Sequence, residues 1–144
     1  MMMKDRYLFK AKTCNGEWVS GFLHCKENKW YISNKAGAPF AFEVRPDTIC
    51  QCTGMTDENG KLIWEGDIIL FQRDNDDCPF PDKDTKKRLG KVFYKDFRTT
   101  FAIGMGESGS GSLNDDLWKY VQNGNRVEVI GNIFDNPDLL EMEV

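Results

Sequence analysis

The chain has 144 residues, of which 40% are hydrophobic and 12% aromatic, enough for the core of one domain or of two small subdomains. Its mean hydropathy of -0.54 excludes a membrane protein, and the first residues lack the apolar segment of a secretory signal, so we expect a cytoplasmic protein. The formal net charge of -4 disfavours binding to nucleic acid and to anionic membranes. The five cysteines are scattered and odd in number, which predicts reduced thiols and no disulfide framework.

The first third of the chain alternates in the way that short β-strands do. One side of a strand predicted over residues 18–25 carries Trp18, Ser20, Phe22 and His24, and the other side carries Val19, Gly21, Leu23 and Cys25. Turns separate this strand from two more, over residues 30–33 and 40–44, which predicts a meander of hairpins. Pro46 then stops sheet pairing before a strand over residues 49–53. We expect an N-terminal β-meander subdomain over residues 1–54.

The remaining residues, 55–144, also alternate strands with turns. Asn59-Gly60 suits a hairpin turn, and the step Glu65-Gly66-Asp67 precedes an apolar run that is typical of a buried strand. We expect strands over residues 63–71, 89–94, 99–104 and 126–134. We expect short helices over residues 114–121, where the helix dipole favours Asp115 and Asp116, and from Pro137, capped by Asn136. This spacing favours a small barrel sealed by the terminal helix, and the two subdomains should form one compact unit.

Two segments carry a more specific pattern. The first combines Gln51, Thr53 and Gly54 with Asn59-Gly60-Lys61 and Glu65-Gly66-Asp67, and the second runs from Val129-Ile130-Gly131-Asn132-Ile133 to Asn136-Pro137. This pattern resembles the YopX family, small proteins encoded by bacteriophages and prophages, mainly of Gram-positive bacteria. Cys52 departs from the pattern, because the family usually has an aromatic residue there. The resemblance implies an all-β protein with short helices, whose second half, 55–144, is similar to an SH3-like barrel. It implies no catalytic residue and no established activity.

A glycine motif follows the strand predicted over residues 99–104. Gly104, Gly106 and Gly109 form a literal G-x-G-x-x-G, the spacing of dinucleotide-binding loops. Such a site needs a helix that opens at the third glycine inside a βαβ unit, so that free amides meet the pyrophosphate. Here Ser110-Gly111-Ser112 follows, and Glu107 would add a carboxylate beside the phosphates. The sequence therefore favours a flexible loop, and we expect no cofactor.

The candidates for metal binding and catalysis are incomplete. Residues 74–77 begin like a calcium loop, but Cys78 and Pro79 stand where that loop needs a ligand and a glycine. Cys50 and Cys52 are one residue apart on a strand, a spacing that favours small buried side chains over zinc ligands. The only histidine, His24, has no nucleophile tied to it by the sequence pattern. We therefore expect no metal and no enzymatic activity, and the alternatives are a weak cation site in the loop over residues 72–87 and a metal-dependent hydrolase built on the acidic loops.

The basic residues cluster in one stretch, 83–98. We expect a non-catalytic binding or adaptor module that contacts another protein, with the loops over residues 72–87 and 104–112 as contact regions. The alternative is a nucleic-acid-binding module, in which lysine and arginine contact phosphates while Tyr94 or Phe97 stacks on bases. Trp118 is the tryptophan best suited to exposure, and the edges of the N-terminal meander leave a homo-oligomer open. The candidate binding surface comprises Lys86, Lys87, Arg88, Lys91, Tyr94 and Trp118.

Overall fold

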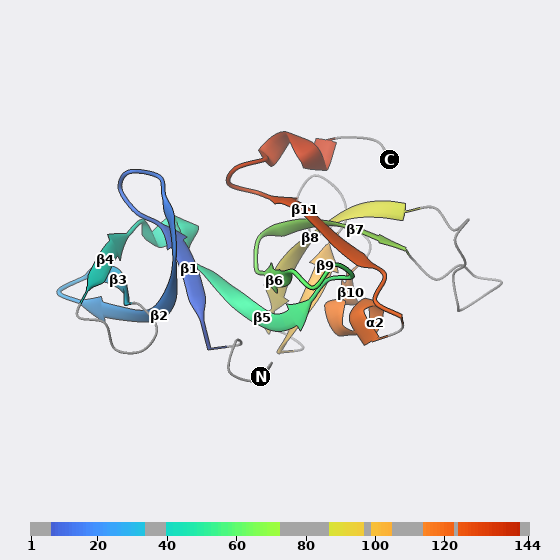
Figure 1. Ribbon diagram of the computed structural model, residues 1–144, viewed down its shortest axis with the longest axis horizontal. Helices are drawn as coiled ribbons and strands as arrows, with labels where there is room; N and C mark the ends of the chain where they lie inside the picture. Colours follow the sequence, from blue (N-terminus) through green and yellow to red (C-terminus); the bar gives the residue numbers. More distant parts are fainter. Residues whose placement is uncertain are drawn as a thin grey trace. The chain divides into compact units, whose positions relative to one another are not determined.

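The computed structural model describes residues 7–33, 40–72, 87–96, 99–104, 114–122 and 124–141. Antiparallel strands dominate these residues, together with one short α-helix and two 3-10 helices (Figure 1). The expectation of a mainly β protein is confirmed. The chain divides into two compact units, Met1–Gly54 and Met55–Val144. None of the helices in the described ranges is long and apolar enough to cross a membrane.

The first unit is an antiparallel meander in the strand order β4-β3-β2-β1-β5. Its elements are β1 (Phe9–Lys12), β2 (Trp18–Lys26), β3 (Lys29–Ser33), β4 (Ala41–Val44), the 3-10 helix η2 (Pro46–Thr48) and β5 (Cys50–Thr56), which continues into the second unit. Strand β2 pairs with β1 through its first residues and with β3 through its last, and the change of partner falls at Gly21. The far end of β1 also meets the end of β4, because Thr13 bridges Val44 and Arg45 donates its backbone N–H to Lys12 O at 2.8 Å.

Alternation along these strands builds the core of the first unit. Ala11, Ile32 and Val44 are buried at its centre. The partly buried side chains packed around them are Phe9, Val19, Leu23, Trp30 and Ile49. Val19 and Leu23 thus face inward, as the period of two predicts, while Ser20 and Phe22 face the opposite side.

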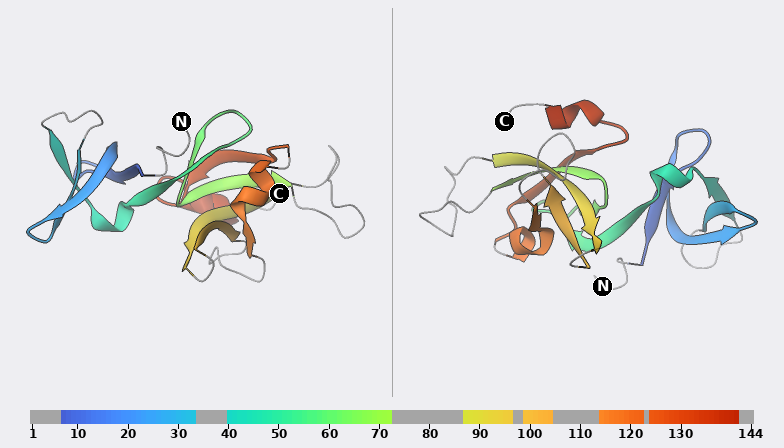
Figure 2. Two further views of the ribbon diagram at one scale, coloured as in Figure 1. Left: turned by 90° about the horizontal axis from the view of Figure 1, so that it is seen from below. Right: turned by 180° about the vertical axis from the view of Figure 1, so that it is seen from behind.

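The second unit contains a five-stranded antiparallel sheet in the order β10-β9-β8-β7-β11 (Figure 2). Its elements are β6 (Leu62–Trp64), β7 (Asp67–Gln72), β8 (Lys87–Lys95), β9 (Thr100–Gly104), β10 (Asn114–Asp116), the helix α2 (Leu117–Gln122), β11 (Val127–Asn132) and the 3-10 helix η4 (Pro137–Glu141). Among the residues that the structure describes, β10 and β11 are the edges of this sheet, which is not closed. The SH3-like barrel expected over residues 55–144 therefore stays a prediction.

The core of the second unit lies between this sheet and α2. Leu117 and Tyr120 reach it from the helix, and the rings of Tyr120 and Phe71 meet edge to face with centroids 5.2 Å apart. The buried members are Ile63, Ile69, Phe71, Val92, Phe101, Ile103, Leu117, Tyr120 and Val127. Alternating buried side chains of β7 to β9 and the buried side chains of α2 therefore pack into the same core.

Three predicted elements have different bounds. The strand expected over residues 63–71 is two strands, because Gly66 turns the chain at φ +89° and the Asp67 carboxylate accepts the backbone N–H of Trp64 at 2.8 Å. The helix expected over residues 114–121 begins only at Leu117, since the three residues before it pair with β9 as β10. The terminal helix is a 3-10 helix.

Asp115, expected at the start of the helix, lies instead in strand β10. Its carboxylate accepts the hydroxyl of Tyr120 at 2.5 Å and lies 4.0 Å from Lys119 Nζ, while its backbone pairs with Ile103. A double-mutant cycle with Asp115→Ala and Tyr120→Phe should therefore give a coupling free energy of about 1–2 kcal/mol in urea unfolding. Asp116→Ala is the control and should show no coupling to Tyr120→Phe. Additive effects of Asp115→Ala and Tyr120→Phe would contradict the tertiary role.

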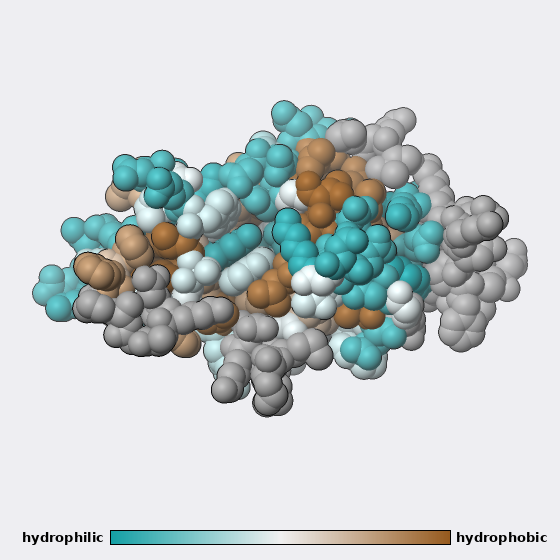
Figure 3. All heavy atoms as spheres, viewed as in Figure 1, coloured by the Kyte–Doolittle hydropathy of each residue, from teal (hydrophilic) through white to brown (hydrophobic). Residues whose placement is uncertain are grey.

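The second of the two segments described above, Val129 to Pro137, forms a turn that packs η4 against β11. Asn132 Oδ1 accepts the backbone N–H groups of Phe134 and Asp135, both at 2.9 Å, and the Asn136 side chain accepts that of Asn132. A Cβ at Gly131 would lie 2.6 Å from Asn136 Oδ1, so only glycine fits there without a shift. In Figure 3 hydrophobic side chains gather near η4, among hydrophilic ones. The signature residues are therefore structural.

Candidate functional site

Strand geometry divides the basic side chains of the candidate surface. Lys87 and Lys91 lie on one side of β8, and Arg88 and Tyr94 lie on the other, which is the side of the buried Val92. Arg88 and Tyr94 are six positions apart, about 20 Å along an extended strand. The stretch that the sequence presents as one patch is thus split between two faces. Lys86 and Phe97 lie outside the described residues, as do most residues of the two predicted contact loops.

The aromatic members of the surface are exposed. Trp118 is 59% exposed because its neighbours Leu117 and Tyr120 take the buried positions of α2, so the expectation for this tryptophan is confirmed. Tyr94 is 39% exposed and packs edge to face on Phe101, with ring centroids 5.3 Å apart. These two rings come from α2 and β8, and β9 lies between β8 and β10 in the sheet. Among its described residues, the second unit therefore presents two large aromatic side chains to solvent.

Two buried carboxylates of the second unit serve the backbone. Asp57 Oδ1 accepts the N–H groups of Asn59 and Lys61 at 2.9 and 2.8 Å, and its Oδ2 accepts that of Val129 at 2.9 Å. Asp67 accepts the backbone N–H of Trp64 at 2.8 Å. Asp57 thereby ties the hairpin turn after β5 to β11, across 72 positions of sequence. Both carboxylates are structural elements of the fold.

The cysteines and the histidine that could supply soft metal ligands have different surroundings. Cys50 and Cys52 are buried, and Cys50 Sγ donates to Thr48 O at 3.3 Å. Cys25 is exposed, and His24 stacks on Tyr31 with ring centroids 5.6 Å apart. Among the residues that the structure describes, no three His, Cys, Asp or Glu side chains are grouped to hold a metal ion.

Charge is distributed unevenly along the chain. Residues 1–54 contain eight Lys and Arg against five Asp and Glu, whereas residues 55–144 contain eleven against eighteen. The net charge of -4 therefore combines a basic first unit with a strongly acidic second one. The net charge of the whole chain conceals this contrast between the units.

Comparison with known proteins supports the family resemblance that the two sequence segments carry. A solved structure of protein EF1440 from Enterococcus faecalis is similar over 93% of this chain and 96% of that one, with a TM-score of 0.53 and 21% identity, which supports a shared fold. A search of curated proteins found no match. The family model described as YopX protein matches residues 1–141, nearly the whole chain. The chain therefore belongs to the YopX family.

Proposed function

We propose that this YopX-family chain is a non-catalytic binding or adaptor module that contacts another protein through its second unit. The observation that carries this proposal is the exposure of Trp118, at 59%, on a helix whose Leu117 and Tyr120 are buried. Tryptophan and tyrosine are frequent anchors of protein interfaces because they bury a large rigid area at a low cost in entropy. Tyr94 supplies a second exposed ring on the same unit.

The acidic character of the second unit favours a protein over nucleic acid as the partner of this surface. Eighteen carboxylates against eleven cations repel a phosphate backbone at long range, whereas an interface built on aromatic anchors needs no positive field. We further propose that the protein is of phage or prophage origin, acts in the cytoplasm of the bacterial host, and has an SH3-like barrel in its second half. Self-association through a strand edge of the first unit is part of the same proposal.

Nucleic acid is the second candidate partner of this unit. Lys87 and Lys91 favour it, because they lie on the same side of β8, about 13 Å apart, and could contact phosphates of the same strand. In this alternative Lys86 adds charge, and on the other side of β8 Arg88 contacts phosphate while Tyr94 stacks on a base. Lys87→Glu combined with Arg88→Glu should then abolish a salt-dependent affinity for mixed-sequence DNA or RNA.

Affinity capture from host lysate with and without nuclease tests the protein-binding role. A discrete protein that survives nuclease should be recovered with the unaltered chain and should fall at least tenfold with Trp118→Ser, because an anchor residue contributes about 2 kcal/mol or more. Phe40→Ser is the matched control: Phe40 is 66% exposed but belongs to the first unit. Equal losses with both variants, or the absence of any protein that survives nuclease, would contradict the proposed interface.

A further inference from the structure

The outward side of β1, β2 and β3 in the first unit carries rings and lysines and no carboxylate. The strand register shows that the residues on this side form five cross-strand pairs. We refer to this surface as the outer sheet face, and its pairs are Lys10–Ser20, Lys12–Trp18, Phe22–Ser33, His24–Tyr31 and Lys26–Lys29. Four lysines, four aromatic rings and two serines thus occupy all ten positions.

These side chains lie outside the core because the other side of the same strands forms it. Ala11 and Ile32 are buried, and Val19 and Leu23 pack against them, so the alternating positions point away. Phe22 is 49% exposed. Ser20, His24, Lys26 and Lys29 are also exposed, and Lys10, Lys12, Trp18, Tyr31 and Ser33 are half-buried. Phe22 therefore presents a large apolar surface to solvent beside the lysines of this face.

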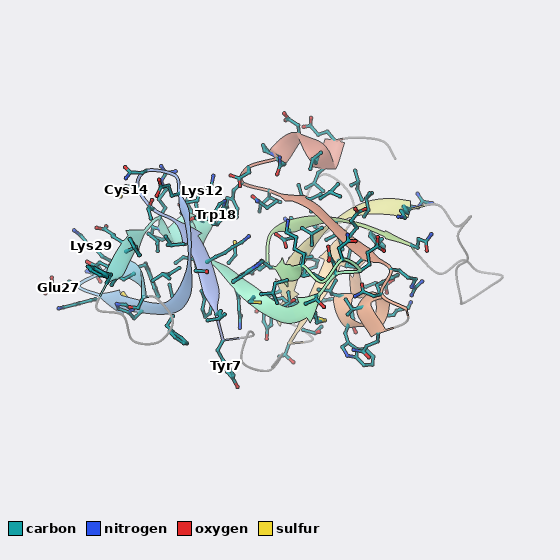
Figure 4. The ribbon with its side chains drawn as sticks, viewed as in Figure 1. Tyr7, Lys12, Cys14, Trp18, Glu27 and Lys29 are labelled. Carbon is teal, nitrogen blue, oxygen red and sulfur yellow. The ribbon has the colours of Figure 1, made fainter. Side chains whose placement is uncertain are left out.

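Rings and ammonium groups are already in contact on this face. Lys10 Nζ lies 4.7 Å and Lys12 Nζ 5.3 Å from the centroid of the Trp18 ring, which holds two positive charges over one aromatic plane. At the other end His24 stacks on Tyr31 with an interplanar angle of 17°. Figure 4 shows Lys12 and Trp18 together near the β1–β2 hairpin and Lys29 at the β2–β3 hairpin. The rings on β2 from Trp18 to His24 span about 20 Å.

We propose that the outer sheet face binds single-stranded nucleic acid. Its lysines would contact phosphates at both ends of the ring series, and its exposed rings would stack on unpaired bases, the combination that non-specific single-strand binders use. A span of about 20 Å matches the lower end of their site sizes, about 4 nucleotides or more. The excess of eight cations over five acids in residues 1–54 gives this unit the field that the chain as a whole lacks.

A single strand fits this face better than the other anionic partners do. In a duplex the faces of the bases are stacked, so Phe22 would have no ring to cover. An acidic protein would also pair with the lysines and pack on the rings, but it has no row of planar bases joined by phosphates to follow the rings and lysines along β2. The outward carboxylate in register nearest to the face is Glu43 on β4, opposite Tyr31, and it limits the surface on that side. The bound strand would therefore run along β2.

Fluorescence anisotropy of a labelled oligo-dT of about 20 nucleotides tests this site with the full chain. We expect binding at about 50 mM salt that weakens steeply by about 200 mM. Lys10→Gln with Lys12→Gln should reduce the salt slope by about 1.4, since each phosphate contact on a single strand contributes about 0.7. Phe22→Ser should weaken binding about tenfold by removing one stacking partner.

Matched variants separate this surface from the others. Phe40→Ser and Lys61→Gln alter an exposed ring and an exposed lysine outside the face and should leave the affinity unchanged. Lys87→Glu with Arg88→Glu should also leave it unchanged, and a loss there would assign binding to β8 and overturn the proposal. Absence of binding at about 50 mM salt, equal affinity for a duplex, or equally tight binding of poly-glutamate would overturn it as well. Trp118→Ser, which tests the protein interface, should have no effect on oligo-dT binding.

Discussion

Gly21→Ala should unfold the first unit or leave it marginally stable. A Cβ at this position would lie 1.9 Å from the backbone oxygen of Ser33, and φ is +156°, so neither β2 nor β3 can accept the methyl group without a backbone shift. We expect a loss of at least about 3 kcal/mol, against a total of about 3–8 kcal/mol for a unit of this size. Hydrogen exchange read by mass spectrometry should show lost protection across β1 to β4.

Gly16→Ala is the control for the backbone conformation alone. Gly16 has φ +82° in the β1–β2 turn, but nothing lies within 4 Å of the position that an alanine methyl group would take. This variant should therefore lose only about 1 kcal/mol, the usual cost of a side chain in the left-handed region. Equal losses at Gly16 and Gly21 would show that the approach of Ser33 O is not what requires glycine in β2.

Asp57→Ala should give the largest loss of stability among single polar substitutions in the second unit. Asp57 is 3% exposed, and its carboxylate accepts three backbone N–H groups, from the 57–61 turn and from β11. Alanine would leave these donors without their acceptor in a buried site, which costs about 3 kcal/mol or more in urea unfolding. Hydrogen exchange at Val129 should rise more than the exchange at Ile103 on strand β9, which has no bond to Asp57.

Glu58→Ala is the adjacent control. Glu58 is exposed, and its backbone N–H donates to Val127 O at 2.9 Å, a contact that alanine keeps. We expect a change within about 0.5 kcal/mol. Asp57→Asn retains one carbonyl oxygen and should fall between the two. If Asp57→Ala matched Glu58→Ala, the carboxylate would not be what joins the turn to β11.

Strand positions in the first unit were predictable because their signal is local. The alternation around Val19 and Leu23 has the two-residue period of a strand, and the pattern is independent of what packs against it. The acids before Leu117 show the opposite case. Asp115 and Asp116 have the composition of a helix start, but pairing with β9 and the hydroxyl of Tyr120 make them part of a strand. The β9 partners, residues 102–104, lie outside the local pattern that predicts a helix.

The two candidate surfaces differ in how well local sequence predicts them, because one is contiguous in sequence and the other is assembled by strand pairing. The stretch 83–98 looks like one basic patch because its residues are adjacent in sequence, yet a strand sends Lys87 and Arg88 to opposite sides. The outer sheet face shows the reverse. Its lysines on β1 and its rings on β2 and β3 are separated by turns, and only the register brings Lys12 opposite Trp18 and His24 opposite Tyr31.

The sequence by itself determined the β class, the turns at Asn59-Gly60 and Gly66, and membership of the YopX family, since each depends on residue preferences over a few positions. The tertiary structure decided the strand register, the division of the basic residues between the two sides of β8, and the role of Asp57. Those features depend on contacts between distant segments, such as the bond from Val129 to Asp57, and a shift of one residue in register would reverse every outward side chain.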